Sequence, residues 1–142
     1  MSRPIATRVQ YAALPYRRKN ASTIEVLLVT SRETKRWVIP KGWPKKRLKP
    51  CHSAAHEARE EAGVVGVVAT EPIGSYSYEK RLKSGNIVTC EVQVFPLKVV
   101  RQQRSWPEKG QREISWFAPD RASEAVREPL LATIISGFGQ ER

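Results

Sequence analysis

Three glutamates in the middle of the chain, Glu57, Glu60 and Glu61, are spaced i, i+3 and i+4 within a run of helix-forming residues. Residues three and four apart lie on one face of a helix, so these carboxylates project into one small volume. A divalent cation would relieve their mutual repulsion, and a set of oxygen ligands selects a hard ion, Mg²⁺ or Mn²⁺, over zinc. The alternative is a solvated acidic helix face, which is the commonest environment of glutamate on helices.

A metal ion at this position would suit chemistry on phosphate groups, because it neutralises phosphate oxygens, orients them and acidifies bound water. Glu57 and Glu61 lie one helical turn apart, so we expect them to be direct ligands. Glu60 lies on the same face but is offset, and we expect it to be the catalytic base that activates water, with metal contact also open. Acids elsewhere in the chain could add an outer ligand, and the sequence does not rank them: Glu91, Glu108 and Glu113.

The segment from Gly42 to Val64 resembles the signature of the Nudix hydrolases, in which a glycine and a loop precede a helix with an Arg-Glu-x-x-Glu-Glu-x-Gly pattern. Leu48 stands where that family has a glutamate, and His56 stands where it has an arginine. Since an acid and a base are lost together, we hypothesise that an apolar contact and an imidazole replace a supporting ion pair. We interpret His56 as a structural substitute for the arginine rather than as an acid or base. The matching positions are Gly42, Glu57, Glu60, Glu61, Gly63 and Val64.

Short motifs outside this segment resemble the diphosphoinositol polyphosphate phosphohydrolase branch, which cleaves phosphoanhydrides in inositol pyrophosphates and dinucleoside polyphosphates. That branch usually has three glycines where this chain has Gly42-Trp43-Pro44. The resemblance implies Mg²⁺-dependent hydrolysis of phosphoanhydride bonds in polyphosphorylated small molecules. The motifs are Ser31-Arg32, residues 36–42, Arg112 with Trp116-Phe117, and Pro129. The resemblance implies that substrate phosphates are bound by Thr30, Ser31, Arg32, Lys41, Gly42 and Arg112.

Positive charge is concentrated in one part of the chain. Residues 17–49 contain eleven lysines and arginines against two acids, so they carry +9 of the net charge of +11. Such a field raises the local concentration of a polyanionic small molecule, which we expect to be the substrate. Nucleic acid would be attracted by the same field, and a generic solubilising surface is the third interpretation.

Two function classes therefore remain. The first is a phosphoanhydride hydrolase, which the three retained helical acids support. The second is a catalytically weakened Nudix domain that binds nucleic acid or a phosphorylated regulator through its basic surface, which the departures at Leu48 and His56 support. We favour the hydrolase.

The acids are positioned by a helix that we expect to begin with Pro50 in its first turn and to end at Gly63, a residue suited to left-handed backbone. A second helix is expected over residues 121–137, with a break before Pro129. Residues 17–22 read as a basic turn. Apolar and alternating runs predict strands over residues 9–16, 24–30, 37–40, 64–70, 75–81, 87–99 and 113–117. This order predicts an α/β protein with a mixed sheet between helices, which agrees with the Nudix-type α/β/α sandwich that the resemblance implies.

Length and composition favour one Nudix domain over residues 1–142, because this is the usual size of a single domain with its own core. No apolar run is long enough for a membrane span, and residues 1–8 have no apolar stretch of a secretory signal. Cys51 and Cys90 form neither a disulfide framework nor a metal-binding spacing, so we expect reduced thiols and a cytoplasmic protein. Monomer and homodimer both remain open.

Overall fold

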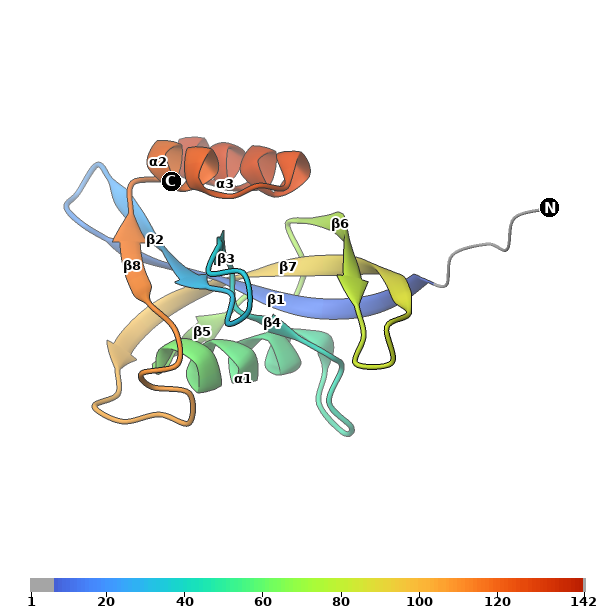
Figure 1. Cartoon of the computed structure of the whole chain (residues 1–142). Coiled ribbons are helices and arrows are strands. Elements are labelled where there is room, and N and C mark those ends of the chain that lie inside the picture. The colour runs from blue at the N-terminus through green and yellow to red at the C-terminus, as the bar shows by residue number, and fades with distance from the viewer. Residues whose placement is uncertain (1–6, 142) are drawn as a thin grey trace.

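A mixed sheet lies between two layers of helices in the structure, a computed structural model that describes residues 7–141. Helix α1 (Pro50–Ala62) covers one face, and α2 (Pro119–Ala125) and α3 (Pro129–Glu141) cover the other (Figure 1). The predicted α/β/α sandwich is therefore confirmed. Within the described residues, no helix is both long enough and apolar enough to cross a membrane. The prediction that residues 1–8 lack a secretory signal falls mostly on residues 1–6, which lie outside the described part.

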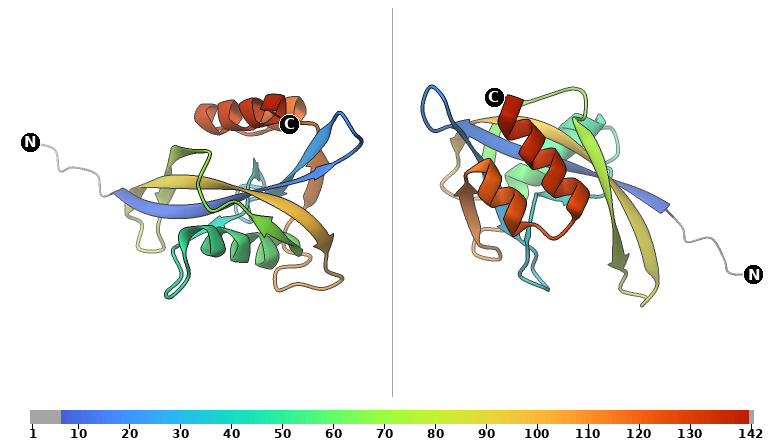
Figure 2. Two further views of the ribbon diagram at one scale, coloured as in Figure 1. Left: turned by 180° about the vertical axis from the view of Figure 1, so that it is seen from behind. Right: turned by 90° about the horizontal axis from the view of Figure 1, so that it is seen from above.

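Within residues 7–141, eight strands form the sheet, and their central path is β3-β2-β1-β7-β5, while β4 pairs with β1, β6 with β7 and β8 with β2. Strands β1 and β7 are parallel, whereas the other pairs are antiparallel, which makes the sheet mixed. Figure 2 shows from above how α2 and α3 lie across the sheet. The strands are β1 (Thr7–Arg18), β2 (Ile24–Thr30), β3 (Trp37–Val38), β4 (Lys41–Gly42), β5 (Val64–Val68), β6 (Gly74–Arg81), β7 (Ile87–Gln102) and β8 (Ile114–Phe117).

Each face of the sheet has its own apolar core. On the side of α1, Ala54, Ala58 and Ala62 are fully buried, and their small side chains let the helix approach the sheet closely. On the other side, Leu131 and Ile135 of α3 are fully buried in a second cluster. The central strands are therefore covered on both faces, and the pattern of buried and polar residues on β7 changes where α1 covers it. Buried side chains alternate with more exposed ones from Val88 to Val94, but residues 95–97 are all buried.

Several predicted boundaries move because strand pairing overrides local turn signals. Arg17 and Arg18 were predicted to lie in a turn, yet they continue β1 because they pair with Glu25 and Ile24 of β2. The strand predicted over residues 64–70 ends at Val68. The second helix, predicted over residues 121–137, is two helices in the structure, α2 and α3. The break before Pro129 is confirmed, whereas α2 begins earlier than expected.

The end of α1 is as predicted, and it fixes the loop that follows β7. Gly63 has a φ of 71°, in the left-handed region, and the ring of Trp106 packs 2.3 Å from the place where a Cβ would lie. The backbone N–H groups of Gln103 and Glu108 donate to the carbonyls of Gly63 and Glu60. The loop over residues 103–113 is therefore held beside the acidic face of α1.

Candidate functional site

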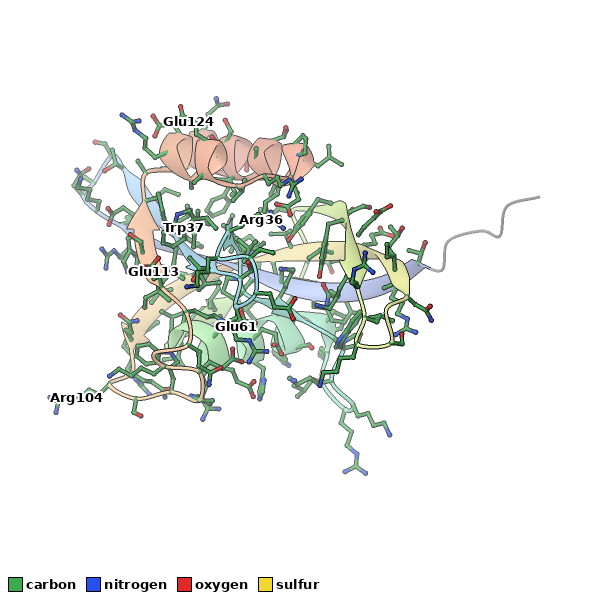
Figure 3. The ribbon with its side chains drawn as sticks, in the orientation of Figure 1. Arg36, Trp37, Glu61, Arg104, Glu113 and Glu124 are labelled. Atoms are coloured by element: carbon green, nitrogen blue, oxygen red, sulfur yellow. The ribbon has the colours of Figure 1, made fainter. Side chains whose placement is uncertain are left out.

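A pocket of about 310 Å³ opens between α1, the turn after β2, β4, β6 and the loop over residues 103–113. Charged side chains of both signs line it. Figure 3 shows Glu61 on α1, close to the turn that joins β2 and β3. The acids are Glu33, Glu57, Glu61 and Glu108, and the cations are Arg32, Lys41, Lys80 and Arg112.

Two of the three predicted helical acids, Glu57 and Glu61, are buried in this pocket, with 7% and 4% of their surface exposed. Burial raises the pKa of Glu61 to about 8; the nearby Glu57 and Glu108 add to the rise, and Arg112 and Lys41 oppose it. Oε2 of Glu57 is buried and accepts no hydrogen bond within the described residues, but it forms an ion pair with Nζ of Lys45, which lies 3.2 Å away. The negative charge of these two adjacent buried carboxylates is only partly compensated, and they offer oxygen donors alone. Such a pair fits a hard divalent cation such as Mg²⁺ or Mn²⁺.

The third helical acid, Glu60, lies at the edge of this arrangement. Its side chain is about one third exposed and does not line the pocket, and its Oε1 lies 3.3 Å from Nε2 of His56. Glu60 can therefore be reached by water more easily than the two buried acids. Its offset on the helix face agrees with the expectation from the spacing.

Gly42 makes room for the carboxylate of Glu57. A Cβ at residue 42 would lie 2.4 Å from both Cδ and Oε1 of Glu57, which is far inside a normal contact. Gly42 itself does not line the pocket. The short strand β4 pairs with β1 and thus places the backbone of Gly42 directly against the buried carboxylate of Glu57. Only a residue without a side chain leaves that carboxylate in place.

Lys41 and Lys80 supply the cations opposite the acids, and both are half-buried. Burial lowers the pKa of Lys41, and the nearby Lys80 and Arg112 act in the same direction, while Glu61 opposes it. Neither lysine has an acidic partner within 4.0 Å among residues 7–141. Nζ of Lys41 lies 5.1 Å from the ring centroid of Tyr78. Two half-buried cations without carboxylate partners make this side of the pocket suited to binding an anion.

Lys80 was not predicted as a site residue. Every second side chain of a strand shares a face, so Tyr76, Tyr78 and Lys80 lie on the same side of β6. The alternation of two tyrosines and Lys80 along this run was the sequence signal that could have placed Lys80 toward the interior. In the structure, Tyr76 is buried and Tyr78 is half-buried. The sequence alone does not show where β6 lies relative to α1.

Arg112 is held by contacts within the site. Its Nε donates to Oε1 of Glu108 at 3.0 Å and lies 3.7 Å from Oε1 of Glu61, and its Nη1 donates to the carbonyl of Thr30 at 3.0 Å. Of the outer acids left unranked above, Glu108 is therefore the one that the structure brings to the pocket. Of the other two, Glu91 is exposed on β7 and Glu113 lines a neighbouring pocket.

Three further predicted residues lie around the turn after β2. Arg32 lines the pocket and donates through Nη1 to Oε1 of Gln111 at 3.1 Å. Ser31 also lines it, and its hydroxyl accepts the backbone N–H of Arg36 at 3.2 Å. Thr30 does not line this pocket; its buried hydroxyl accepts the backbone N–H of Glu113 at 2.9 Å. Thr30 lines a neighbouring pocket of about 280 Å³, together with Ser31 and Arg32.

The two positions that depart from the signature, Leu48 and His56, lie near each other. Both line a pocket of about 290 Å³ on another side of α1, together with His52 and Arg59. His52 is exposed. This proximity is what the hypothesis of a replaced ion pair requires.

The chain is similar to known proteins in both sequence and structure, although no protein-family model matches it. It is 32% identical over 120 residues to Nudix hydrolase 12, mitochondrial, from Arabidopsis thaliana, covering 81% of this chain and 58% of the relative. For Nudix hydrolase 18, mitochondrial, from the same plant, the identity is 31%, and the coverage is 81% and 66%. The chain therefore spans less than two thirds of the length of these relatives.

Solved structures share the fold at lower identity. A MutT protein from Methanosarcina mazei Go1 has a TM-score of 0.72 at 20% identity, covering 99% of this chain and 98% of that structure. An Ap4A hydrolase from C. elegans has a TM-score of 0.65 at 18% identity, with 93% and 96% covered. These matches confirm the sandwich described above.

The expectation of a cytoplasmic protein is contradicted by the relatives. Five of the seven similar curated proteins carry "mitochondrial" in their names, and one is named chloroplastic. Cys51 and Cys90 are free and buried in the structure, as expected of reduced thiols. Free buried thiols do not distinguish one reducing compartment from another, so they could not support the prediction of a cytoplasmic location.

Proposed function

Because the chain belongs to the Nudix hydrolase superfamily, we propose that it hydrolyses phosphoanhydride bonds in polyphosphorylated small molecules, with Mg²⁺ or Mn²⁺ as cofactor. The observation that carries this proposal is one pocket in which the buried acids Glu57 and Glu61 lie with the half-buried cations Lys41 and Lys80. The acids suit a metal ion and the cations suit phosphate oxygens, which are the two requirements of phosphoanhydride hydrolysis.

We assign roles from burial and position. Glu57 and Glu61 would hold the ion, which when bound neutralises phosphate oxygens and acidifies water. Glu60 is the proposed proton acceptor for the attacking water, because its carboxylate is about one third exposed and can exchange protons with solvent. Arg112 is already fixed by Glu108, so we assign it to positioning the loop and to contact with phosphate.

The cations extend from Arg32 to Lys80 across the pocket, which suits a substrate with several phosphates. Trp43 and Tyr78 also line the pocket and offer aromatic faces on which a nucleobase can stack. Of the two substrate classes expected from the sequence, dinucleoside polyphosphates therefore fit better than inositol pyrophosphates. The similarities to known proteins do not favour the alternative of a weakened domain that binds nucleic acid.

The direct experiment measures Mg²⁺-dependent phosphate or nucleotide release from diadenosine polyphosphates, inositol pyrophosphates and nucleoside triphosphates. We expect turnover of at least one class, with the diadenosine polyphosphates highest. Negligible hydrolysis of the whole panel, despite confirmed Mg²⁺ binding, would defeat the proposal.

Arg32→Ala and Lys41→Ala should impair substrates with more phosphates more strongly than substrates with fewer. Each lost cation leaves a larger negative charge uncompensated, and added salt should reproduce part of the effect on the wild type. The measurement is kcat/KM against phosphate chain length, with Lys98→Ala, an exposed lysine outside the pocket, as control. An equal loss at every chain length would contradict the proposed phosphate contacts.

Restoring the family pair by Leu48→Glu together with His56→Arg should change Mg²⁺-dependent activity by about tenfold at most, since partners of metal ligands tune such sites on this scale. The two side chains line one pocket, so each single change should do less than the pair. A nearly inert wild type that the double change activates steeply would indicate a degenerate domain instead.

A further inference from the structure

Gln10 of β1 is a buried polar residue to which the proposed function gives no role. It lines the same pocket as Lys41 and Lys80, although only 3% of its surface is exposed. The hydroxyl of Tyr78 donates to its Oε1 at 2.6 Å, whereas its Nε2 donates no hydrogen bond within residues 7–141. Nε2 is not sealed off from solvent, so it can be reached from the pocket. Because buried amides are normally hydrogen-bonded, the two N–H groups are left for a bound molecule.

The contact between Gln10 and Tyr78 is built by three paired strands. Gln10 and Tyr76 both lie opposite Val92 of β7, and side chains opposite one another in a sheet share a face. Tyr78 lies on the same side of β6 as Tyr76, and its long side chain reaches across β7 to Gln10. Both side chains are therefore held by regular backbone rather than by a loop.

Tyr78 decides which end of the amide is left for a ligand. An amide has a carbonyl that accepts hydrogen bonds and an NH₂ group that donates them, and rotation exchanges their places. Burial raises the pKa of Tyr78, so the phenol keeps its proton and remains a donor. A donor selects the carbonyl of Gln10 as its partner. The pair therefore offers the pocket an uncharged group that donates hydrogen bonds.

The cations beside this amide indicate what it binds. Nζ of Lys41 lies 5.1 Å from the ring centroid of Tyr78, and Lys80 follows Tyr78 on the same side of β6. Neither lysine has an acidic partner within 4.0 Å among residues 7–141. An anion attracted by these lysines brings oxygen acceptors to the amide, and hydrogen bonds to a charged acceptor are the stronger kind.

We propose that Gln10 binds a phosphate group of the substrate through its amide N–H groups, and that Tyr78 is the residue that positions this amide. A lysine is a flexible point charge that attracts a phosphate group without fixing its orientation. The buried amide of Gln10 supplies that orientation. The inference rests on the proposed function for the identity of the substrate, but it requires no metal ion and can be tested on the metal-free protein.

The test is a calorimetric titration of the metal-free full chain with inorganic tripolyphosphate and, separately, with diadenosine tetraphosphate. Gln10→Leu removes the amide without adding charge, and it should weaken the binding of both molecules by about tenfold or more. Gln10→Glu keeps the shape of the side chain and the oxygen that Tyr78 contacts. It should weaken binding at least as much, and it replaces Gln10→Leu if that variant does not fold.

Tyr78→Phe tests the positioning role, because it keeps the aromatic ring and removes only the hydroxyl. It should weaken the binding of both molecules by a smaller factor than Gln10→Leu does. If Tyr78 acts through Gln10, adding Tyr78→Phe to Gln10→Leu should cause little further loss, whereas additive losses would contradict the positioning role. In the hydrolysis assay, each single variant should raise KM by a larger factor than it lowers kcat.

Gln93→Leu is the matched control, because Gln93 is a half-buried glutamine of β7 that does not line the pocket. It should bind tripolyphosphate like the wild type, and circular dichroism of each variant checks that the fold is intact. Unchanged tripolyphosphate binding in Gln10→Leu would overturn the inference, as would an equal loss in Gln93→Leu. A loss confined to diadenosine tetraphosphate would also overturn it, since the amide would then contact the nucleoside.

The outcome for Gln10 can be separated from the outcome for the proposed function. A wild type that hydrolyses no substrate, but whose tripolyphosphate binding depends on Gln10, would defeat the proposed function and leave the phosphate contact in place. Normal hydrolysis together with tripolyphosphate binding that Gln10→Leu does not change would do the reverse. A wild type that does not bind tripolyphosphate would overturn the phosphate contact as well.

Discussion

Glu57→Gln and Glu61→Gln are each expected to lower Mg²⁺-dependent hydrolysis by about 10²-fold or more, with a parallel loss of metal affinity. Glutamine keeps the shape of the side chain and removes its charge, so the change acts on ligation rather than on packing. Both acids are buried beside each other in the pocket, so either change removes a charged oxygen ligand from the proposed metal site. The measurements are kcat/KM at several Mg²⁺ concentrations and the affinity for Mg²⁺ itself.

Measurements of stability distinguish a loss of metal ligation in these variants from unfolding. Burial raises the pKa of Glu61 to about 8, which shows that its charge is unfavourable in the metal-free protein. Glu61→Gln should therefore leave the melting temperature of the metal-free protein unchanged or higher. Glu79→Gln, an exposed acid on β6, is the control and should retain normal turnover. Near-normal turnover of either pocket variant at low Mg²⁺ would show that the residue is not a ligand.

Gly42→Ala is expected to lower activity by up to about 10²-fold, since a displacement of about 1 Å at a reacting site can cost this much. The added methyl group would meet Cδ and Oε1 of Glu57 at 2.4 Å, so the carboxylate must move. The contact is with the end of a flexible side chain, and Gly42 does not have a positive φ. The melting temperature should therefore change little while Mg²⁺ affinity and kcat fall together.

Gly137→Ala on α3 is the matched control for this substitution. A Cβ there meets no atom within 4 Å, and alanine is a better helix former than glycine, so activity should persist and stability should not fall. If Gly42→Ala retains full activity, Glu57 does not need its present position, and the proposed role of β4 is wrong.

The site could be predicted from the sequence where it depends on local geometry. The spacing of Glu57, Glu60 and Glu61 defines one helix face whatever surrounds it, because the helical repeat depends only on backbone hydrogen bonds. Gly63 was predicted to end α1 for an equally local reason, since left-handed backbone favours glycine, and its φ of 71° confirms this. The succession of helices and strands along the chain, and with it a mixed sheet between helices, followed from alternation and apolar runs, although the ends of β1 and β5 did not.

Other features depend on contacts between residues far apart in the chain, and only the tertiary structure reveals them. Lys80 reaches the pocket because β6 pairs with β7, and Glu108 reaches it because its loop donates to the carbonyl of Glu60. The clearance that Gly42 gives Glu57 exists only once β4 pairs with β1.

The sequence by itself therefore determined that three acids share a helix face, and the tertiary structure decided which of them are buried. Glu57 and Glu61 are enclosed by the packing of α1 on the sheet, whereas Glu60 stays about one third exposed. The physical reason is that local hydrogen bonding sets the direction of a side chain, while burial, and with it the raised pKa of Glu61, depends on what packs against that side chain.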